Sequence, residues 1–244
     1  IGKEYVVYLK RSNNYLRLKQ TSGVDIQQKI HDMMASPKGK ASVKDTLNKV
    51  NFDSCVYPSR YNDEREMTRY FSFVFVNATE VSAETNWSVK SENIPGDGVV
   101  YGIIPHSAEN LSEIKEVLLS ASGQAEQAIF VVPNQYTDIS EVIAEFNAVS
   151  ILREAAIDDK VLFDEYEVIY EDLREVINAY IKAYTQPEKY MARYIYQGKE
   201  HMIGRKASLT GLISDICDKV FSQTPVINNE AINKDDITSI AYNS

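Results

Sequence analysis

The chain has 244 residues, of which 44% are hydrophobic and 25% are charged, a composition typical of a globular protein with a sizeable core. With 26 Lys and Arg against 35 Asp and Glu, the formal net charge is −9. This argues against a dedicated DNA- or RNA-binding module, because such modules neutralise phosphates with cations. The distant Cys55 and Cys217 form no disulfide framework and no apolar run approaches the ~20 residues of a membrane span, so we expect a cytoplasmic protein without a membrane partner.

The first part of the chain predicts a β-hairpin followed by two short helices. Residues 4–19 alternate between apolar and polar side chains on either side of a turn at Ser12–Asn14. Apolar residues then recur at helical spacing over Val24–Met34, and a second short helix is expected over Val43–Val50, after a breaker-rich loop at 36–40.

The middle of the chain carries the clearest architecture. Val99–Ile104 and Ala128–Val132 are continuous apolar runs that both end in proline, and amphipathic helices are expected over 111–121 and 139–152. Two uniformly apolar strands separated by a helix predict a parallel pair that is buried on both faces. The expected fold class is therefore α/β, with a partial doubly wound sheet that contains a parallel βαβα unit.

The C-terminal part predicts helices. A long amphipathic helix is expected over 161–184, and a last helix over Leu209–Phe221 with Ser208 as its N-cap. We therefore divide the chain into an α/β domain at 1–155 and a helical region at 156–244.

Both ends of the chain predict that it is an internal piece of a longer protein. Ile1 leads directly into a strand-like run, and Asp235–Ile240 opens a helix that stops at Ser244, so the helical region is expected to be truncated at its C-terminus.

A nucleotide site is the first chemistry that a sheet of this class suggests. Gly39-Lys40-Ala41-Ser42 resembles the end of a P-loop, but Met34 stands where the leading glycine belongs and Ala41 where the magnesium-binding Ser or Thr belongs. The loop is better explained as basic and structural. We expect no cofactor in this chain.

A metal-dependent nuclease or phosphoesterase centre is an alternative. Asp97 followed by Glu113 and Lys115 resembles the acidic-residue-plus-Glu-X-Lys arrangement that holds a divalent metal. That chemistry needs the last two residues on a strand, and on a helix they point about 200° apart. The histidines show no metal-ligand spacing, so no metal ligand is predicted. Because the Glu-X-Lys pair is expected on a helix, no catalytic residue is predicted either.

The stretch Arg60–Phe71 is dense in charges of both signs and in aromatic residues. Arg60, Arg65 and Arg69 are candidates for an interface or for phosphate contacts, and Arg65 and Arg69 share a face if the segment is helical. A local salt-bridge cluster at the entry to the strand-like run that starts at Phe71 explains the same residues, and a DNA-contacting module remains a further alternative.

Two segments carry a resemblance to a known family. Ser208–Phe221 ends in Asp-Lys-Val-Phe, and Thr224–Asn233 reads Thr-Pro-Val-Ile-Asn-Asn-Glu-Ala-Ile-Asn. This region resembles a segment of the very large P-loop ATPases of bacterial BREX-type phage-defence systems. The Arg60–Phe71 stretch is similar to an upstream motif of the same group, whereas Ala231 departs from it by standing where a larger apolar residue is expected.

The resemblance implies a function for the parent protein and a supporting role for this chain. A Walker-type ATP site would lie upstream of Ile1, and the parent would use ATP, DNA and partner proteins. This chain would then be a non-catalytic accessory region that contacts other domains of the parent or other defence-system subunits. No ATP, metal or DNA site follows from the resemblance for these residues themselves.

Overall fold

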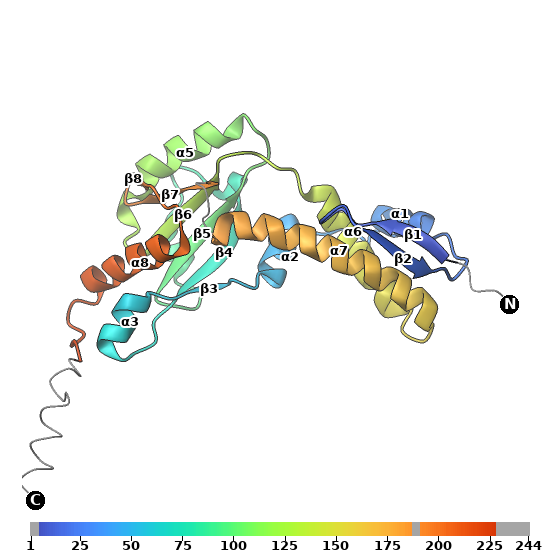
Figure 1. Ribbon diagram of the computed structural model, residues 1–244. Coiled ribbons are helices and arrows are strands. Elements are labelled where there is room, and N and C mark those ends of the chain that lie inside the picture. Colours follow the sequence, from blue (N-terminus) through green and yellow to red (C-terminus); the bar gives the residue numbers. More distant parts are fainter. Residues whose placement is uncertain (1–4, 187–190, 228–244) are drawn as a thin grey trace, which may run out of the picture.

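The computed structural model describes residues 5–186 and 191–227 (Figure 1). It has a six-stranded mixed sheet of order β3-β4-β5-β6-β7-β8 and a separate two-stranded sheet, β1-β2. The strands are β1 (Tyr5–Leu9), β2 (Leu16–Gln20), β3 (Cys55–Val56), β4 (Phe71–Asn77), β5 (Gly98–Ile104), β6 (Ala128–Pro133), β7 (Ala192–Tyr196) and β8 (Lys199–His201). The helices are α1 (Ile26–Ala35), α2 (Val43–Val50), α3 (Ser59–Arg65), α4 (Trp87–Ser91), α5 (Asn110–Ala121), α6 (Ser140–Ala155), α7 (Lys160–Thr185) and α8 (Lys206–Val220), with 3-10 turns η1 (Ala78–Glu80) and η2 (Ser122–Gln124).

The centre of the large sheet is parallel, as the two apolar runs predict. β4, β5 and β6 are parallel neighbours, with Val99 opposite Ala128 and Gly102 opposite Val131. β3 is antiparallel to β4, while β7 and β8 continue the sheet beyond β6 in antiparallel pairs. The expected α/β class with a parallel βαβα unit is confirmed.

Helices cover both faces of the sheet, because successive side chains of a strand point to opposite sides. On one face, Tyr101 and Phe130 pack with Trp87 of α4 and with apolar residues of α5. On the other, Val100 and Ile129 belong to a second cluster that includes residues of α2, α6, α7 and α8. We call these the α5 face and the α7 face of the sheet.

Glycines on β5 make room for aromatic rings on β4. Gly102 lies opposite Phe75, and a Cβ atom at Gly102 would lie 2.9 Å from the Phe73 ring and 3.0 Å from the Phe75 ring. The rings therefore occupy the space above the glycine on the α7 face. A glycine inside a buried strand is otherwise destabilising, and its value here is close packing.

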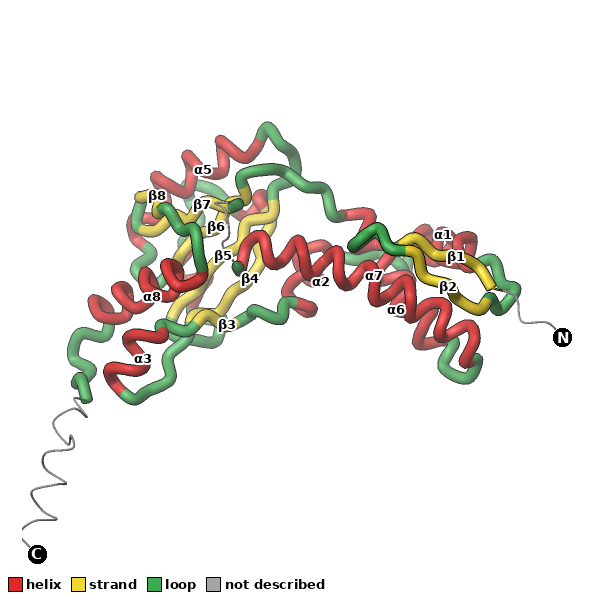
Figure 2. The backbone as a smooth tube through the Cα atoms, in the orientation of Figure 1, coloured by secondary structure: helices red, strands yellow, loops and turns green. Residues whose placement is uncertain are grey.

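A helical arm extends from the α7 face. We use this name for the antiparallel α6–α7 pair together with α1 and the β1–β2 hairpin; Figure 2 shows that the hairpin lies far from the large sheet. α1 packs against α6, and β2 packs against α7. The last turns of α7 return to the sheet, where the Tyr184 hydroxyl donates to the carbonyl of Ile103 at 3.2 Å and its ring meets Phe75 edge-on.

Residues 192–201 form a strand pair that the sequence patterns did not predict. Gln197 and Gly198 have positive φ angles of 46° and 71°, as a tight two-residue turn between antiparallel strands requires. The predicted division between 155 and 156 falls in the turn that joins α6 to α7. Strands from both sides of this division belong to one sheet, since β7 pairs with β6.

The last helix begins earlier than predicted. α8 starts at Lys206 with Arg205 at its N-cap, so the assignment of Ser208 as the N-cap is wrong. The helix opening predicted at 235–240, and the part of the family-like segment beyond Ile227, lie outside the described residues.

Candidate interaction surface

A crevice lies at the edge of the sheet where open α/β folds bind ligands. α5 and α6 leave β5 and β6 toward opposite faces, and ligands of such folds bind beyond the strand ends at that point. A cavity of about 330 Å³ there is lined by residues that include Asn77, His106, Asp138 and Ser140. The backbone N–H of Ser140 donates to Asp138 at 2.9 Å and lowers the pKa of that carboxyl, which makes it a weaker base. The crevice therefore lies where ligands of such folds bind. Its carboxylate Asp138, however, is not activated as a general base.

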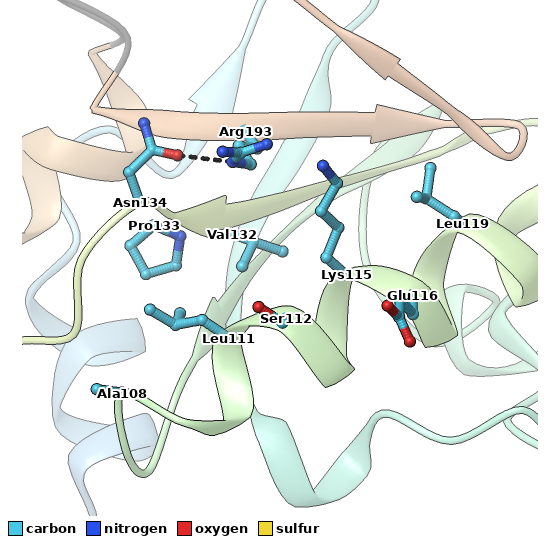
Figure 3. Close-up of a pocket in the computed structure, with 10 residues that line it drawn as sticks. All are labelled: Ala108, Leu111, Ser112, Lys115, Glu116, Leu119, Val132, Pro133, Asn134 and Arg193. Carbon is cyan, nitrogen blue, oxygen red and sulfur yellow. Dashed lines mark hydrogen bonds between the residues drawn. The ribbon is translucent and has the colours of Figure 1, made fainter.

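A larger cavity of about 510 Å³ lies between α5 and the β6–β7 pair. Figure 3 shows Lys115 reaching from α5 toward β7, where Arg193 lies beside Asn134. The Arg193 Nε atom donates to Asn134 at 3.0 Å, and Arg193 and Lys115 both pair with the carboxylate of Glu200, at 3.1 and 2.6 Å. The hydrogen bond from Lys115, together with Arg193, lowers the pKa of Glu200. These charges tie α5 to β7 and β8.

The residues of the nuclease alternative are not brought together. Asp97 immediately precedes β5 and accepts hydrogen bonds from Arg69 and from the backbone N–H of Tyr70. Glu113 lies in the first turn of α5, beyond the opposite end of β5, and Lys115 pairs with Glu200 on β8. Within residues 5–186 and 191–227, no group of three or more His, Cys, Asp or Glu side chains is arranged to hold a metal ion.

The loop that resembles a P-loop end packs against the arm. The backbone N–H of Gly39 donates to the carbonyl of Ser36 at 3.1 Å, and its carbonyl accepts from the Asn147 side chain of α6 at 3.0 Å. A Cβ atom at Gly39 would lie 1.9 Å from the Met33 carbonyl oxygen. The glycine therefore permits a close contact between backbone segments, as the structural explanation of this loop predicts.

Arg60 and Arg65 join α3 to α8. Arg60 pairs with Glu64 at 3.2 Å and with Asp218 at 2.6 Å, while the more buried Arg65 pairs with the same two carboxylates at 3.1 and 2.9 Å. The Arg65 guanidinium also lies 4.0 Å from the centre of the Tyr61 ring. This is the local salt-bridge cluster that the sequence offered as one explanation.

Arg69 lies beyond the end of α3 and contacts residues close to the Arg60 and Arg65 cluster. α3 ends at Arg65, with Glu66 in the left-handed conformation, so the shared helical face considered for Arg65 and Arg69 does not form. The Arg69 guanidinium pairs with Asp97 and lies 3.7 Å from the centre of the Phe221 ring. Because carboxylates and rings of this chain engage all three arginines, the structure explains them as internal contacts, while a phosphate contact remains a prediction.

The β1–β2 hairpin presents an apolar face to solvent. Val7 lies opposite Leu18 and Leu9 opposite Leu16, so these residues share one side of the two-stranded sheet. We call this side the outer hairpin face; its five apolar members are between 54% and 71% exposed: Tyr5, Val7, Leu9, Leu16 and Leu18. Apolar patches of this kind mark sites of interaction.

The opposite side of the hairpin faces the arm and, apart from Val6, carries polar groups. The Tyr8 hydroxyl donates to Asp172 at 2.9 Å, and Arg17 pairs with Glu171 at 3.1 Å. At the turn, the backbone N–H groups of Arg11 and Ser12 donate to the two oxygens of Asp172 at 2.8 and 3.0 Å. An antiparallel sheet with one solvated face normally buries its apolar side, and here the order is reversed.

Buried carboxylates of the arm enforce this reversal. Glu145, Glu165 and Asp172 are at most 6% exposed, and each accepts hydrogen bonds from the hairpin or from the segment that follows it. The N–H and hydroxyl groups of Ser22 both donate to Glu165. A shift of the hairpin by one residue would place leucines on these carboxylates and leave buried charges unpaired, which costs several kcal/mol.

The fold defines a mixed α/β protein whose most distinctive surface is the outer hairpin face. No protein-family model, no curated protein and no solved structure matches the chain. Among the helices in the described part of the chain, none combines the length and the apolar character needed to cross a membrane.

The sequence patterns predicted the hairpin but not that its apolar side faces solvent. The alternation Leu16-Arg17-Leu18-Lys19 signals two unlike faces, and the usual interpretation buries the leucines. The surplus of acidic residues on the predicted helix over 161–184 was the available signal that the basic side would face inward.

Proposed function

We propose that this chain is a non-catalytic interaction region of a larger protein, and that it acts through the outer hairpin face. The observation that carries the proposal is the reversed polarity of the hairpin. Its charged residues pair with the arm, whereas its leucines face solvent. An exposed group of apolar side chains on one small sheet marks a site of interaction.

The parent protein that we propose is a large bacterial ATPase of the BREX-type phage-defence class, located in the cytoplasm. Support comes from the resemblance of the 60–71 and 208–233 segments, whose described parts include α3 and α8, two helices that pack against each other. The backbone N–H of Ile227 also donates to the carbonyl of Glu64 at 2.9 Å. The free cysteines Cys55 and Cys217 agree with a reducing compartment. The proposed partners are other domains of the parent and other subunits of the defence system.

Stability measurements on polar substitutions test the docking role. Leu16→Ser combined with Leu18→Ser is expected to change the free energy of unfolding by no more than about 0.5 kcal/mol for each residue, because an exposed side chain loses little on replacement. The control is the buried Leu118→Ser on the α5 face, which is expected to cost more than about 2 kcal/mol. A loss at the hairpin as large as that at Leu118 would mean that the leucines belong to the core, and the docking role would fail.

Calorimetric titration with ATP and magnesium tests the non-catalytic part of the proposal. We expect neither binding nor hydrolysis by the chain. Specific micromolar binding, or turnover, would overturn that part whatever the hairpin does.

A further inference from the structure

We infer that the outer hairpin face is the interface of a homodimer, in which two copies pack their hairpins face to face about a twofold axis. This inference rests on the proposed function, since it names the partner of that docking surface as a second copy of this chain.

Exposed apolar residues concentrate on the hairpin. Of the fifteen large hydrophobic residues that are exposed in the described part of the chain, seven lie between Tyr5 and Leu18. The other eight are dispersed over the rest of the fold, from Phe52 to Ile227. Single exposed apolar residues are ordinary, whereas a group on one small sheet marks a site of interaction.

The chemistry of this face fits a copy of itself. Among the described residues of the hairpin, the charged side chains pair with carboxylates of the arm, and the apolar members of the outer hairpin face carry no charge; the paired residues are Lys10, Arg11, Arg17 and Lys19. A nucleic acid or a charged protein surface would therefore find no complementary charge there. Two copies of an uncharged apolar face can meet without burying an unpaired ion, as an interface of twofold symmetry requires.

The hairpin geometry also suits face-to-face packing. The arm packs against the inner side, and among the described residues the five apolar side chains of the outer side stay between 54% and 71% exposed. Two sheets pack about 10 Å apart through interdigitated side chains, and a hairpin in isolation is marginally stable. Pairing would turn two hairpins into a four-stranded sandwich, with the leucines at its centre and the amphipathic Tyr5 at its margin.

The available area predicts a weak dimer. Five side chains with roughly 100 Å² of exposed surface each cover about 500 Å² per copy, so a pair buries about 1,000 Å², which is the lower limit for a specific interface. Dissociation in the micromolar range is therefore expected.

Sedimentation equilibrium from about 1 to about 100 µM tests the inference in the range where such a dimer dissociates. The wild-type chain should change from monomer to dimer, and Leu16→Glu combined with Leu18→Glu should remain monomeric throughout. The matched control is Val89→Glu combined with Met202→Glu, which charges two residues exposed elsewhere and should leave the dimer intact. If the glutamate pair reduces the circular dichroism of the fold, the milder Leu18→Ser should still weaken association severalfold.

The possible results separate the dimer from the docking role. A wild-type chain that stays monomeric at the highest concentration, or a folded Leu16→Glu/Leu18→Glu variant that still dimerises, overturns the homodimer. If the wild type is monomeric while serine substitutions at Leu16 and Leu18 leave stability unchanged, the docking role survives with a different partner. If those serine substitutions unfold the chain, both proposals fail.

Discussion

The guanidinium of Arg11 donates two hydrogen bonds, of 2.7 and 3.1 Å, to the carboxylate of Glu145, which lies 134 residues away in the sequence. Paired hydrogen bonds of this kind fix orientation as well as distance. Glu145 is buried on α6, whereas Arg11 sits at the hairpin turn. This contact and those of Asp172 therefore decide which side of the hairpin faces the arm.

Arg11→Ala should destabilise the protein, because it leaves the buried Glu145 carboxylate without its partner. We expect a loss of roughly 1–3 kcal/mol in the free energy of unfolding, measured by urea denaturation. Arg17→Ala is the matched control, since Arg17 and Glu171 are both about half exposed, and it should cost less than about 1 kcal/mol. Equal losses at the two arginines would contradict the assigned role of the buried pair.

Protonation of Asp172 should loosen the hairpin at low pH. Burial raises the pKa of Asp172, but hydrogen bonds from Ser12, from the backbone N–H of Arg11 and from Tyr8 lower it more, so the folded value lies below the ordinary 3.8. A group with a depressed folded pKa stabilises the protein above its unfolded pKa, and this stability is lost as the pH falls through the folded value. Hydrogen exchange at the Arg11 and Ser12 amides should therefore lose protection below about pH 4, relative to amides of β5.

Asp172→Asn is the control for this pH effect. It removes the titrating group, so the exchange protection of the hairpin should already be low near neutral pH and should change little on acidification. A wild-type pH dependence that persists unchanged in Asp172→Asn would assign the effect to another carboxyl group.

Gly102→Ala should destabilise the sheet, because its methyl group would meet the Phe73 and Phe75 rings at about 3 Å. Overpacking of this kind costs about 1–3 kcal/mol, and adding Phe75→Leu should recover part of it. Gly211→Ala is the control: nothing lies within 4 Å of the added atom in the interior of α8, so it should stabilise the protein by about 0.5–1 kcal/mol. Trp87, the single tryptophan, reports unfolding of the sheet by fluorescence.

Arg65→Ala should cost about 2–3 kcal/mol, because Arg65 is nearly buried between Tyr61 and Asp218 and its removal breaks a network. Arg65→Lys should restore less than half of the loss, since an ammonium group reproduces neither the stacking nor the paired hydrogen bonds. Arg60→Ala, at a side chain that is 43% exposed, should cost less than about 1 kcal/mol. Thermal or urea unfolding measures all three.

The same variants test the DNA alternative. With Arg60, Arg65 and Arg69 paired internally and a net charge of −9, the chain is expected not to bind duplex DNA even at low salt. Steep salt-dependent binding that disappears in Arg65→Ala would instead establish a DNA-contacting role for the cluster.

The buried parallel pair β5 and β6 could be predicted from the sequence, whereas β7 and β8 could not. Val99–Ile104 and Ala128–Val132 are apolar at every position that both faces of the sheet must bury, so local composition determines the parallel arrangement. The exposed Arg193 interrupts β7 after its first residue, and β8 has only three residues, so neither forms a long apolar run. The turn at Gln197 and Gly198 was the only local signal for them.

The hairpin separates most clearly what the local sequence determines from what the tertiary contacts determine. The alternation Leu16-Arg17-Leu18-Lys19 by itself determines that one side is apolar and the other basic, because side chains of a strand alternate with a period of two. It does not determine which side turns inward, since that depends on what lies opposite. Only the tertiary structure places Glu145 and Asp172 beneath the hairpin, and buried carboxylates select the basic side because an unpaired buried charge costs more than exposed leucines.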